Sequence, residues 1–251
     1  MNALTDGCAI VTGAGSGLGR ALALALSHHM QVAGLGRRME ALEETERLAG
    51  GNFLPLQADI SDPQQVTQAF DTARNIAPIT LLINNAAIYP RVDFLDETPA
   101  GFMQVVNINL GGMITCTRAA LSDMSATGFG RILNVSTFAD LHPLPASSAY
   151  AVSKGAARIF TRALIADIGD RFPEIVVNDW MPGMLATGMG IKDGLDPAVA
   201  AAWGAKLALW HDQSLTGTIW EMASEIPPAR SLKRRIADRV LLRPRIRPRQ
   251  L

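Results

Sequence analysis

The sequence predicts an α/β fold in which a doubly wound parallel sheet of about seven strands is covered by helices on both faces. Three observations predict it. Short β-rich apolar runs alternate with longer helical patterns along the chain, and the first run leads into a glycine-rich turn and a helical pattern. In addition, 48% of the 251 residues are apolar, which is enough for one large core.

The elements follow one another in a regular β-α order. The runs predicted as strands are Cys8–Val11, Gln31–Leu35, Phe53–Gln57, Thr80–Ile83, Arg131–Val135, Ile175–Asp179 and Thr218–Met222. The stretches predicted as helices are Leu18–His28, Met39–Ala49, Pro63–Asn75, Thr98–Met124, Ser148–Arg171 and Pro197–Trp210. Parallel sheets of this kind bind ligands outside the carboxyl ends of their strands, so functional residues are expected there.

The chain divides into one domain and a tail. We expect a single domain over residues 1–226, because no repeat or low-complexity linker interrupts it, and a basic Pro/Arg-rich tail over residues 227–251. Residues 229–251 hold nine basic residues and one acid, so the rest of the chain, with 14 basic and 22 acidic residues, carries a charge of −8. The tail is expected either to be disordered or to lie on an acidic surface of its own or a neighbouring subunit.

Composition excludes several classes of protein. No window reaches about 18 consecutive apolar residues, so a membrane-spanning helix is not expected. The first strand begins at Cys8, which leaves no room for a secretory leader, and a cytoplasmic location is expected. Cys8 and Cys116 lie inside apolar segments without Cys or His spacing around them, so they are interpreted as buried free thiols, and no metal site is expected.

The glycine-rich turn comes directly after the first predicted strand and reads Thr12-Gly13-Ala-Gly15-Ser-Gly17-Leu-Gly19. Glycines let a backbone approach a pyrophosphate closely, and the amides of a following helix face its negative charge. The spacing is neither GxGxxG nor that of a P-loop. Taken alone, the motif is compatible with a phosphate site or with a flexible turn between strand and helix.

The end of the second predicted strand bears on the choice of nucleotide. An acid at this place would bind a ribose 2′-hydroxyl, whereas arginine accommodates a 2′-phosphate. The sequence has Arg37 and Arg38 there, with no acid before Glu40. NADP(H) is therefore favoured over NAD(H), the alternative being two solvated arginines at the end of a strand.

A phenol and an ammonium lie four residues apart at Tyr150 and Lys154, on one face of a predicted helix. A nearby cation favours the phenolate, which suits a phenol for acid/base work near neutral pH. Thirteen residues before the tyrosine, Thr137 and its neighbour Ser136 follow a predicted strand. Either hydroxyl at that strand end could hold a carbonyl oxygen.

These motifs together resemble the short-chain dehydrogenase/reductase family, in register from about residue 6 to residue 221. The resemblance rests on Thr12-Gly-x-x-x-Gly17-x-Gly19, Asp59, Asn84-Asn85-Ala86, Asn109, Ser136-Thr137, Tyr150-x-x-x-Lys154, Pro182-Gly183 and Thr187. It implies a Rossmann-type fold, a nicotinamide cofactor and a tetrad of Asn, Ser, Tyr and Lys. By position, the catalytic residues are Asn109, Thr137, Ser136, Tyr150 and Lys154.

The resemblance also assigns roles. Tyr150 would exchange the proton, Lys154 would lower the pKa of that phenol and hold the nicotinamide ribose, and Asn109 would support a water-linked proton path to Lys154. With the glycine turn and the two arginines, the residues expected to bind the cofactor are Gly13, Ser16, Gly17, Leu18, Gly19, Arg37, Arg38, Asp59, Ile60, Asn85, Ala86, Tyr150, Lys154, Pro182, Gly183, Leu185 and Thr187.

The chain departs from the family pattern in three places. Thr137 stands where the family has serine, which keeps the hydroxyl but stiffens the side chain. Ala87 replaces the glycine that usually follows Asn-Asn-Ala, and the glycine pair expected after Glu221 is missing. The last departure puts the family's tetramer packing in question, so a homodimer and a homotetramer both remain open.

The segment over the substrate side is short, with only about ten residues between Thr187 and the last predicted helix. This is similar to carbonyl-reductase-like members of the family and predicts an open, shallow pocket. Candidate lining residues are Tyr89, Phe138, His142, Met184 and Met189. They are apolar or amphipathic, and no arginine is expected to pair a substrate carboxylate.

The favoured interpretation is an NADP(H)-dependent oxidoreductase that interconverts a neutral, hydrophobic or aromatic ketone or aldehyde and its alcohol. The alternatives are an NAD-dependent secondary-alcohol dehydrogenase and a non-enzymatic cofactor-binding regulator. The expected partner is a small molecule, and nucleic acid is disfavoured because the domain is acidic.

Overall fold

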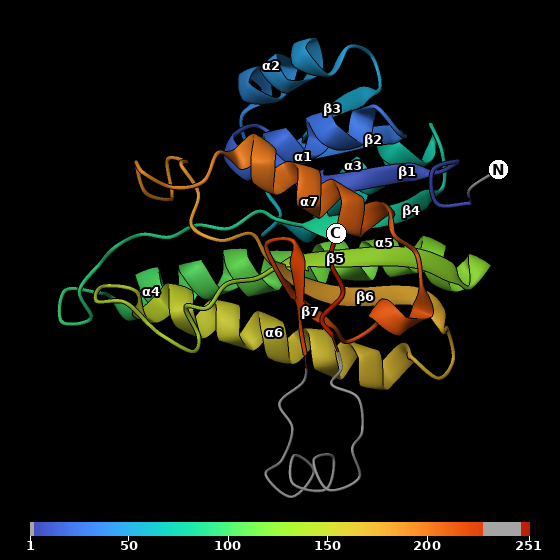
Figure 1. Cartoon of the computed structure of the whole chain (residues 1–251). Coiled ribbons are helices and arrows are strands. Elements are labelled where there is room, and N and C mark those ends of the chain that lie inside the picture. The colour runs from blue at the N-terminus through green and yellow to red at the C-terminus, as the bar shows by residue number, and fades with distance from the viewer. Residues whose placement is uncertain (1–2, 228–246) are drawn as a thin grey trace, which may run out of the picture.

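The computed structural model describes residues 3–227 and 247–251 and confirms the α/β fold (Figure 1). Its single sheet has eight strands in the order β3-β2-β1-β4-β5-β6-β7-β8. The strands are β1 Cys8–Thr12, β2 Gln31–Gly36, β3 Phe53–Gln57, β4 Ile79–Asn84, β5 Phe129–Val135, β6 Glu174–Met181, β7 Ile219–Glu221 and β8 Ser224–Ile226. The first seven pair in parallel, as predicted.

The eighth strand corrects the expected number of about seven. After β7 the chain reverses at Met222, whose φ is +49°, and β8 pairs with β7 in the antiparallel direction. A hairpin strand of three residues is too short to show a β pattern in the sequence. The reversal also shortens the seventh strand, which was predicted over Thr218–Met222.

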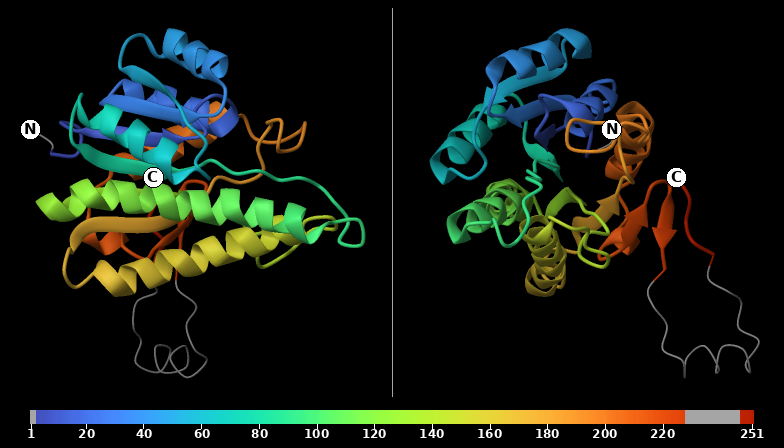
Figure 2. Two further views of the ribbon diagram at one scale, coloured as in Figure 1. Left: turned by 180° about the vertical axis from the view of Figure 1, so that it is seen from behind. Right: turned by 90° about the vertical axis from the view of Figure 1, so that its left-hand side faces the viewer.

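Helices cover both faces of the sheet, as the two views of Figure 2 show. One face carries α1 Gly17–Ser27, α2 Met39–Ala49 and α7 Pro197–Leu209. The other carries α3 Pro63–Arg74, α4 Pro99–Val106, α5 Gly112–Thr127 and α6 Ser148–Ile168. The sheet therefore has a separate apolar layer on each side, which explains why β1 and β4 are buried along their whole length.

The helix predicted over Thr98–Met124 is not uniform. A π-helical segment, Asn107–Gly111, separates α4 from α5. Segments of this kind are rare and occur frequently at functional sites. The apolar pattern of the sequence continues through it without interruption, so only the structure reveals it.

The described end of the chain lies along β8. The Leu251 amide donates to the Ala223 carbonyl, and the Glu225 amide donates to the Arg249 carbonyl. The Arg249 guanidinium binds both carboxylate oxygens of Glu225, at 2.7 and 3.0 Å. These last residues thus dock on an acidic side chain of the same chain. Residues 228–246 of the tail predicted over 227–251 lie outside the described residues.

Two further sequence-based expectations can be compared with the structure. Cys8 and Cys116 are buried free thiols, and burial raises the pKa of each to about 12. Within residues 3–227 and 247–251, no helix is long and apolar enough to cross a membrane.

Candidate active site

The carboxyl ends of β1, β4, β5 and β6 bring most of the predicted site residues together. β4 and β5 place Asn84 opposite Asn134, and β5 and β6 place Asn134 opposite Asp179. Tyr150 and Lys154 reach this edge from the first turns of α6. The site is therefore assembled by sheet register and by one helix.

The glycine turn has the geometry that the phosphate interpretation requires. Gly13 and Gly17 have positive φ values of +71° and +53°, which side chains rarely adopt. A Cβ on Gly19 would lie 2.1 Å from the Gly13 carbonyl oxygen, so the backbone there tolerates only glycine. Ser16 begins α1 without a side-chain capping bond, and the first turn contains no acidic residue. This helix N-terminus is thus suited to an anion such as a pyrophosphate.

Arg20 supports the glycine turn, although it was not among the predicted site residues. Its guanidinium donates to the Gly15 carbonyl at 2.7 Å, to the Ala41 carbonyl at 3.1 Å and to the Thr45 hydroxyl at 3.1 Å. It thereby fixes the glycine turn against α2. The sequence offered only a basic residue in the first turn of a helix, a place where an acid would be the favourable choice.

Thr12 joins the ends of β1 and β4. Its hydroxyl accepts hydrogen bonds from the Asn85 and Ala86 amides, at 2.9 and 3.0 Å, and the Asn85 side chain donates to the Thr12 carbonyl. Asn85 and Ala86 are therefore held beside Gly13, where cofactor contacts were expected. Asn84, which precedes them, is buried and bonds Asn134 and Thr117 instead.

A hollow of about 290 Å³ lies at the carboxyl ends of β2 and β3, lined by Arg37, Gln57, Asp59 and Gln65. Asp59 accepts bonds from the amide and hydroxyl of Ser61. Arg38 lies outside this lining and begins α2. Ile60 is nearly buried against Gly112 of α5. Of the two arginines that were predicted to face a 2′-phosphate, Arg37 is the one that lines this hollow.

Tyr150 lies between the Thr137 hydroxyl and a second tyrosine. Burial raises the pKa of Tyr150 to about 12, a hydrogen bond between the Thr137 and Tyr150 side chains opposes this rise, and Tyr89 adds to it. Of the two hydroxyl residues that the sequence left open, Thr137 acts on the pKa of the phenol, whereas Ser136 is buried and its amide donates to the Trp180 carbonyl. Which hydroxyl binds a carbonyl oxygen stays a prediction.

The causes that shift the pKa of the Tyr150 phenol are burial, the Thr137 side chain and Tyr89, so the role that the family resemblance implies for Lys154 stays a prediction. The Lys154 ammonium is almost fully buried and donates to the Val135 carbonyl at 2.9 Å. Burial lowers the pKa of Lys154 to about 8, and the nearby Asp179 carboxylate opposes that change. An amine with this pKa is only partly charged at mildly alkaline pH, so its effect on the phenol is weakened.

Asp179 is a second group that sequence reasoning missed. It is buried at the end of β6, where the Thr161 hydroxyl donates to it at 2.8 Å. Burial raises the pKa of this carboxyl to about 7, opposed by the Thr161 bond and then by the positive charges of Arg158, Lys154 and Arg162. Its only sequence signal is an acid that lies two residues after the apolar run Ile175–Val177.

Asn109 lies in the π-helical segment and makes local contacts. Its side chain accepts from the Ile88 amide at 2.8 Å and donates to the Ile88 carbonyl at 2.9 Å and to the Ser153 hydroxyl at 3.0 Å. It therefore ties the loop after β4 to α6, next to Lys154. The predicted water-linked path to Lys154 is not tested by these contacts.

The loop between β6 and α7 lies next to the glycine turn. A Cβ on Gly17 would lie 3.2 Å from the Thr187 methyl, so this loop meets the glycine turn. Leu185 is buried and pairs with Leu195, and Gly183 has a φ of +90° after Pro182. On the substrate side Met184 and Met189 are exposed, by 72% and 41%.

An arginine lies closer to the site than expected. The Tyr89 ring stacks on that of Tyr150, and the Arg91 guanidinium lies 5.4 Å from the centroid of the Tyr89 ring. No arginine was expected to pair a substrate carboxylate, and residue 91 is far from Tyr150 and Lys154 along the chain. The loop after β4 brings it there.

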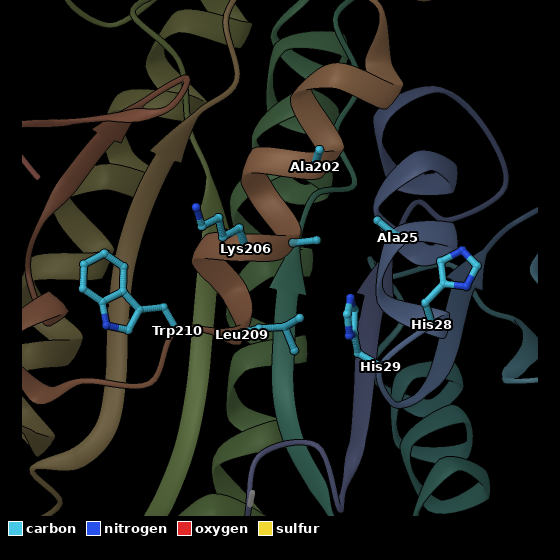
Figure 3. A pocket seen from close by; sticks show the side chains of 8 residues that line it. Ala25, His28, His29, Ala202, Lys206, Leu209 and Trp210 are labelled. Atoms are coloured by element: carbon cyan, nitrogen blue, oxygen red, sulfur yellow. The ribbon is translucent and has the colours of Figure 1, made fainter. Parts of the chain in front are cut away.

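A second hollow, of about 510 Å³, lies between the carboxyl-terminal ends of α1 and α7 (Figure 3). Helices that connect parallel strands run opposite to them, so this hollow lies at the far edge of the sheet from Tyr150. It is lined by Ala25, His28, His29, Ala202, Ala205, Lys206, Leu209 and Trp210. None of these is a predicted site residue.

The arrangement of these residues agrees with comparisons to known proteins. A family model described as short chain dehydrogenase matches residues 7–197. Galactitol 2-dehydrogenase (L-tagatose-forming) of Cereibacter sphaeroides is 34% identical over 205 residues, which cover 80% of each chain. Mouse L-xylulose reductase is 34% identical over 77% of this chain and 78% of its own.

A probable NADP-dependent dehydrogenase of Haemophilus influenzae is 33% identical over 70% of each chain. The glycine turn at the start of α1, the Tyr150 and Lys154 pair on α6 and the Thr137 hydroxyl lie together at one edge of a parallel sheet, and the family model spans all of them. The chain is therefore a member of the short-chain dehydrogenase/reductase family.

Proposed function

We propose that this oxidoreductase uses NADP(H) to interconvert a neutral, hydrophobic or aromatic ketone or aldehyde and its alcohol. The observation that carries the proposal is the arrangement of Tyr150, whose helix presents Lys154 one turn later and whose pKa is lowered by the nearby Thr137 side chain against the larger effect of burial. Family membership supports an activity on alcohols and carbonyls and a nicotinamide cofactor.

Each of these side chains has a chemical task in the proposed reaction. With its pKa raised to about 12, Tyr150 holds its proton at neutral pH and can donate it to a carbonyl oxygen. The Thr137 hydroxyl would bind the same oxygen while negative charge develops on it. Lys154, buried between α6 and the end of β5, would hold the ribose next to the nicotinamide. The cofactor, when bound, supplies or accepts the hydride.

The preference for NADP(H) rests on Arg37. Its side chain lines the hollow at the ends of β2 and β3, where the cofactor's adenosine end is expected. Arginine is well suited to a phosphate because its planar fork donates two hydrogen bonds at once. One relative is named NADP-dependent, which supports the same choice.

The proposed substrate class rests on the exposed Met184 and Met189 and on the aromatic Tyr89. Arg91 already stacks on Tyr89, so this cation is engaged rather than directed at a substrate carboxylate. Two relatives carry the names of enzymes for the sugar alcohols and ketoses galactitol, L-tagatose and L-xylulose, which makes L-xylulose a useful contrast to aromatic ketones.

The test is the consumption of NADPH and, separately, of NADH by the purified protein. The substrates would be acetophenone, benzaldehyde, an aliphatic ketone, a keto acid and L-xylulose, with Tyr150→Phe measured in parallel. We expect the fastest turnover with NADPH and an aromatic carbonyl, and a fall in Tyr150→Phe to below about 1% with NADPH binding retained.

Other outcomes would revise specific parts of the proposal. Preference for NADH would replace it with the NAD-dependent dehydrogenase, and preference for L-xylulose would correct the substrate class. Binding of NADPH without turnover of any of these carbonyls would favour the cofactor-binding regulator instead.

We further propose that the protein acts as a homodimer or homotetramer in the cytoplasm. Support comes from exposed apolar side chains on α4, α5 and α6, among them Met103, Ile114, Val152 and Ile159. Light scattering during size-exclusion chromatography would give the number of subunits, and a monomer would overturn this part of the proposal.

A further inference from the structure

Arg158 belongs to the same helix face as the catalytic pair. It follows Lys154 by four residues and Tyr150 by eight on α6, so phenol, ammonium and guanidinium form a row at one-turn intervals. Arg158 is 8% exposed, although arginine is almost never fully buried unless it is paired. Arg158, the last of these three side chains, lies against the loop that follows β5.

The Arg158 guanidinium binds that loop at two points. One of its nitrogens donates to the Thr137 carbonyl and to the Asp140 carboxylate, the latter at 2.9 Å. The same nitrogen lies 3.6 Å from the Met181 sulfur at the end of β6. The arginine thus connects α6, the β5–α6 loop and the end of β6 at a single place.

Stability alone does not account for this arginine. The Asp140 ion pair has side chains that are 9% and 15% exposed, and the Arg158 Nε atom is buried without a hydrogen-bond partner in the structure. A buried ion pair can often be replaced by apolar residues of similar volume without loss of stability. Because burial of the Arg158 charge costs free energy, we expect this side chain to have a role besides stability.

We propose that Arg158 is a positioning residue, which fixes the Thr137 backbone so that its hydroxyl stays against the Tyr150 phenol. The stiff side chain of threonine provides the link. Because its Cβ is branched, the direction of the hydroxyl follows closely from the backbone. Fixing the carbonyl of Thr137 consequently fixes the direction of its hydroxyl. A serine side chain rotates more freely, so the direction of its hydroxyl would depend less on a fixed backbone. This inference rests on the proposed oxidoreductase function.

The kinetic test uses Arg158→Met, with Arg158→Lys and Asp140→Asn as milder variants, on the carbonyl that the wild type reduces best. We expect kcat of Arg158→Met to fall by about 10- to 100-fold while the KM for NADPH changes by less than about twofold, because misplacing a group near the reacting atoms costs rate rather than cofactor binding. Asp140→Asn should show a smaller fall in the same direction.

A double variant separates positioning from general weakening of the fold. In Thr137→Val the hydroxyl is already absent, so adding Arg158→Met should lower kcat by less than about twofold. Full additivity of the two losses would overturn the proposal. If an Arg158 variant fails to fold, Asp140→Asn, which retains Arg158, is combined with Thr137→Val for the same comparison of kcat.

Arg131 provides a matched control. It is fully buried near the start of β5, its guanidinium donates to backbone carbonyls and to Asn178, and its Nε atom also lacks a partner. It lies six residues from Thr137, or about 20 Å along extended chain. Arg131→Met should lower stability but leave kcat per folded molecule unchanged.

Hydrogen exchange keeps the test independent of catalysis. In Arg158→Met we expect amides of residues 136–142, among them that of Ala139 bonded to the Thr137 hydroxyl, to exchange at least about tenfold faster, with no such change in Arg131→Met. If the wild type turns over no carbonyl, this measurement still decides whether Arg158 holds the loop. Unchanged exchange in residues 136–142 would overturn the proposal even in an active enzyme.

Discussion

The Tyr89 ring stacks on the Tyr150 ring, with centroids 4.3 Å apart and planes inclined by 22°. One face of the Tyr150 phenol is thereby covered by a second phenol. Burial and then Tyr89 raise the pKa of Tyr150, while the Thr137 side chain opposes the rise. The Tyr150 phenol accordingly keeps its proton at neutral pH, as the proposed proton donor in a carbonyl reduction must.

The pKa of Tyr150 can be measured directly, because the chain has only two tyrosines. In Tyr89→Phe the absorbance of tyrosinate near 295 nm, a wavelength typical of that ion, reports Tyr150 alone. With a pKa of about 12, Tyr150 should remain mostly protonated at pH 10.5, where an ordinary tyrosine with a pKa of about 10 is mostly ionised. Circular dichroism would confirm that the fold persists, and Tyr150→Phe reports Tyr89 as the comparison. A Tyr150 already ionised at pH 10.5 would contradict the burial argument.

A second prediction concerns Arg37. Arg37→Ala should weaken NADPH binding by about 10-fold or more, the value of one charged hydrogen bond, and leave NADH binding nearly unchanged. Arg38→Ala is the matched control, because Arg38 lies outside the hollow that Arg37 lines. Fluorescence titration with each nucleotide measures both constants. Equal losses for the two nucleotides would show that Arg37 does not bind the 2′-phosphate.

The fold was predictable because its signals are local and repeated. The central parallel strands are buried on both faces and read as apolar runs, and most helices carry an apolar stripe. β8 and the π-helical segment were not predicted from the sequence, for two different reasons. A strand of three residues has no period, and an extra residue in a helical turn leaves the apolar pattern of Thr98–Met124 intact.

Local spacing predicted only site residues that lie close together in the sequence, and more distant ones such as Asn109 and Thr187 came from the family resemblance. Tyr150 and Lys154 are one helical turn apart, and the glycine turn is continuous. Arg158 has the same spacing from Lys154 and could have been found by extending the face one more turn. Asp179 and Arg91 reach the site through sheet register and loop path, which no local spacing encodes.

Asp179 leads to a prediction about pH. Its pKa in the folded protein, about 7, is above the ordinary value of 3.8, so its contribution to stability is fully present below pH 4 and is lost as the pH rises through 7. Asn cannot titrate but can accept the Thr161 hydrogen bond. Asp179→Asn should therefore gain stability relative to the wild type between pH 4 and pH 8, by up to about 4 kcal/mol.

Urea denaturation at several pH values measures this difference. Asp212→Asn serves as the control of opposite sign, because the Ser214 side chain and amide hold the pKa of Asp212 below its ordinary value. A stability difference for Asp179→Asn that does not change between pH 4 and pH 8 would show that the carboxyl is not buried as described.

The end of the chain yields a further stability prediction. Arg249 binds Glu225 through two nitrogens, donates to the Ser214 hydroxyl at 2.8 Å, and lies 5.6 Å and 5.9 Å from the ring centroids of Trp210 and Trp220. The pair is partly exposed, so solvent limits its strength, but its bidentate geometry favours it over an ordinary surface pair. Arg249→Ala should lower the free energy of unfolding by about 1 kcal/mol and Tm by about 2–4 °C.

The pH dependence of that loss identifies its source. The Arg249 side chain holds the pKa of Glu225 below its ordinary value, so the stabilisation is present above about pH 4.5 and is lost as the pH falls through the lowered value. The difference between wild type and Arg249→Ala in thermal melts should accordingly shrink toward pH 3. Arg47→Ala removes the exposed pair with Glu44 on α2 and should change stability by less than about 0.5 kcal/mol. An equal effect of the two substitutions would mean that the chain end is not docked on Glu225 in solution.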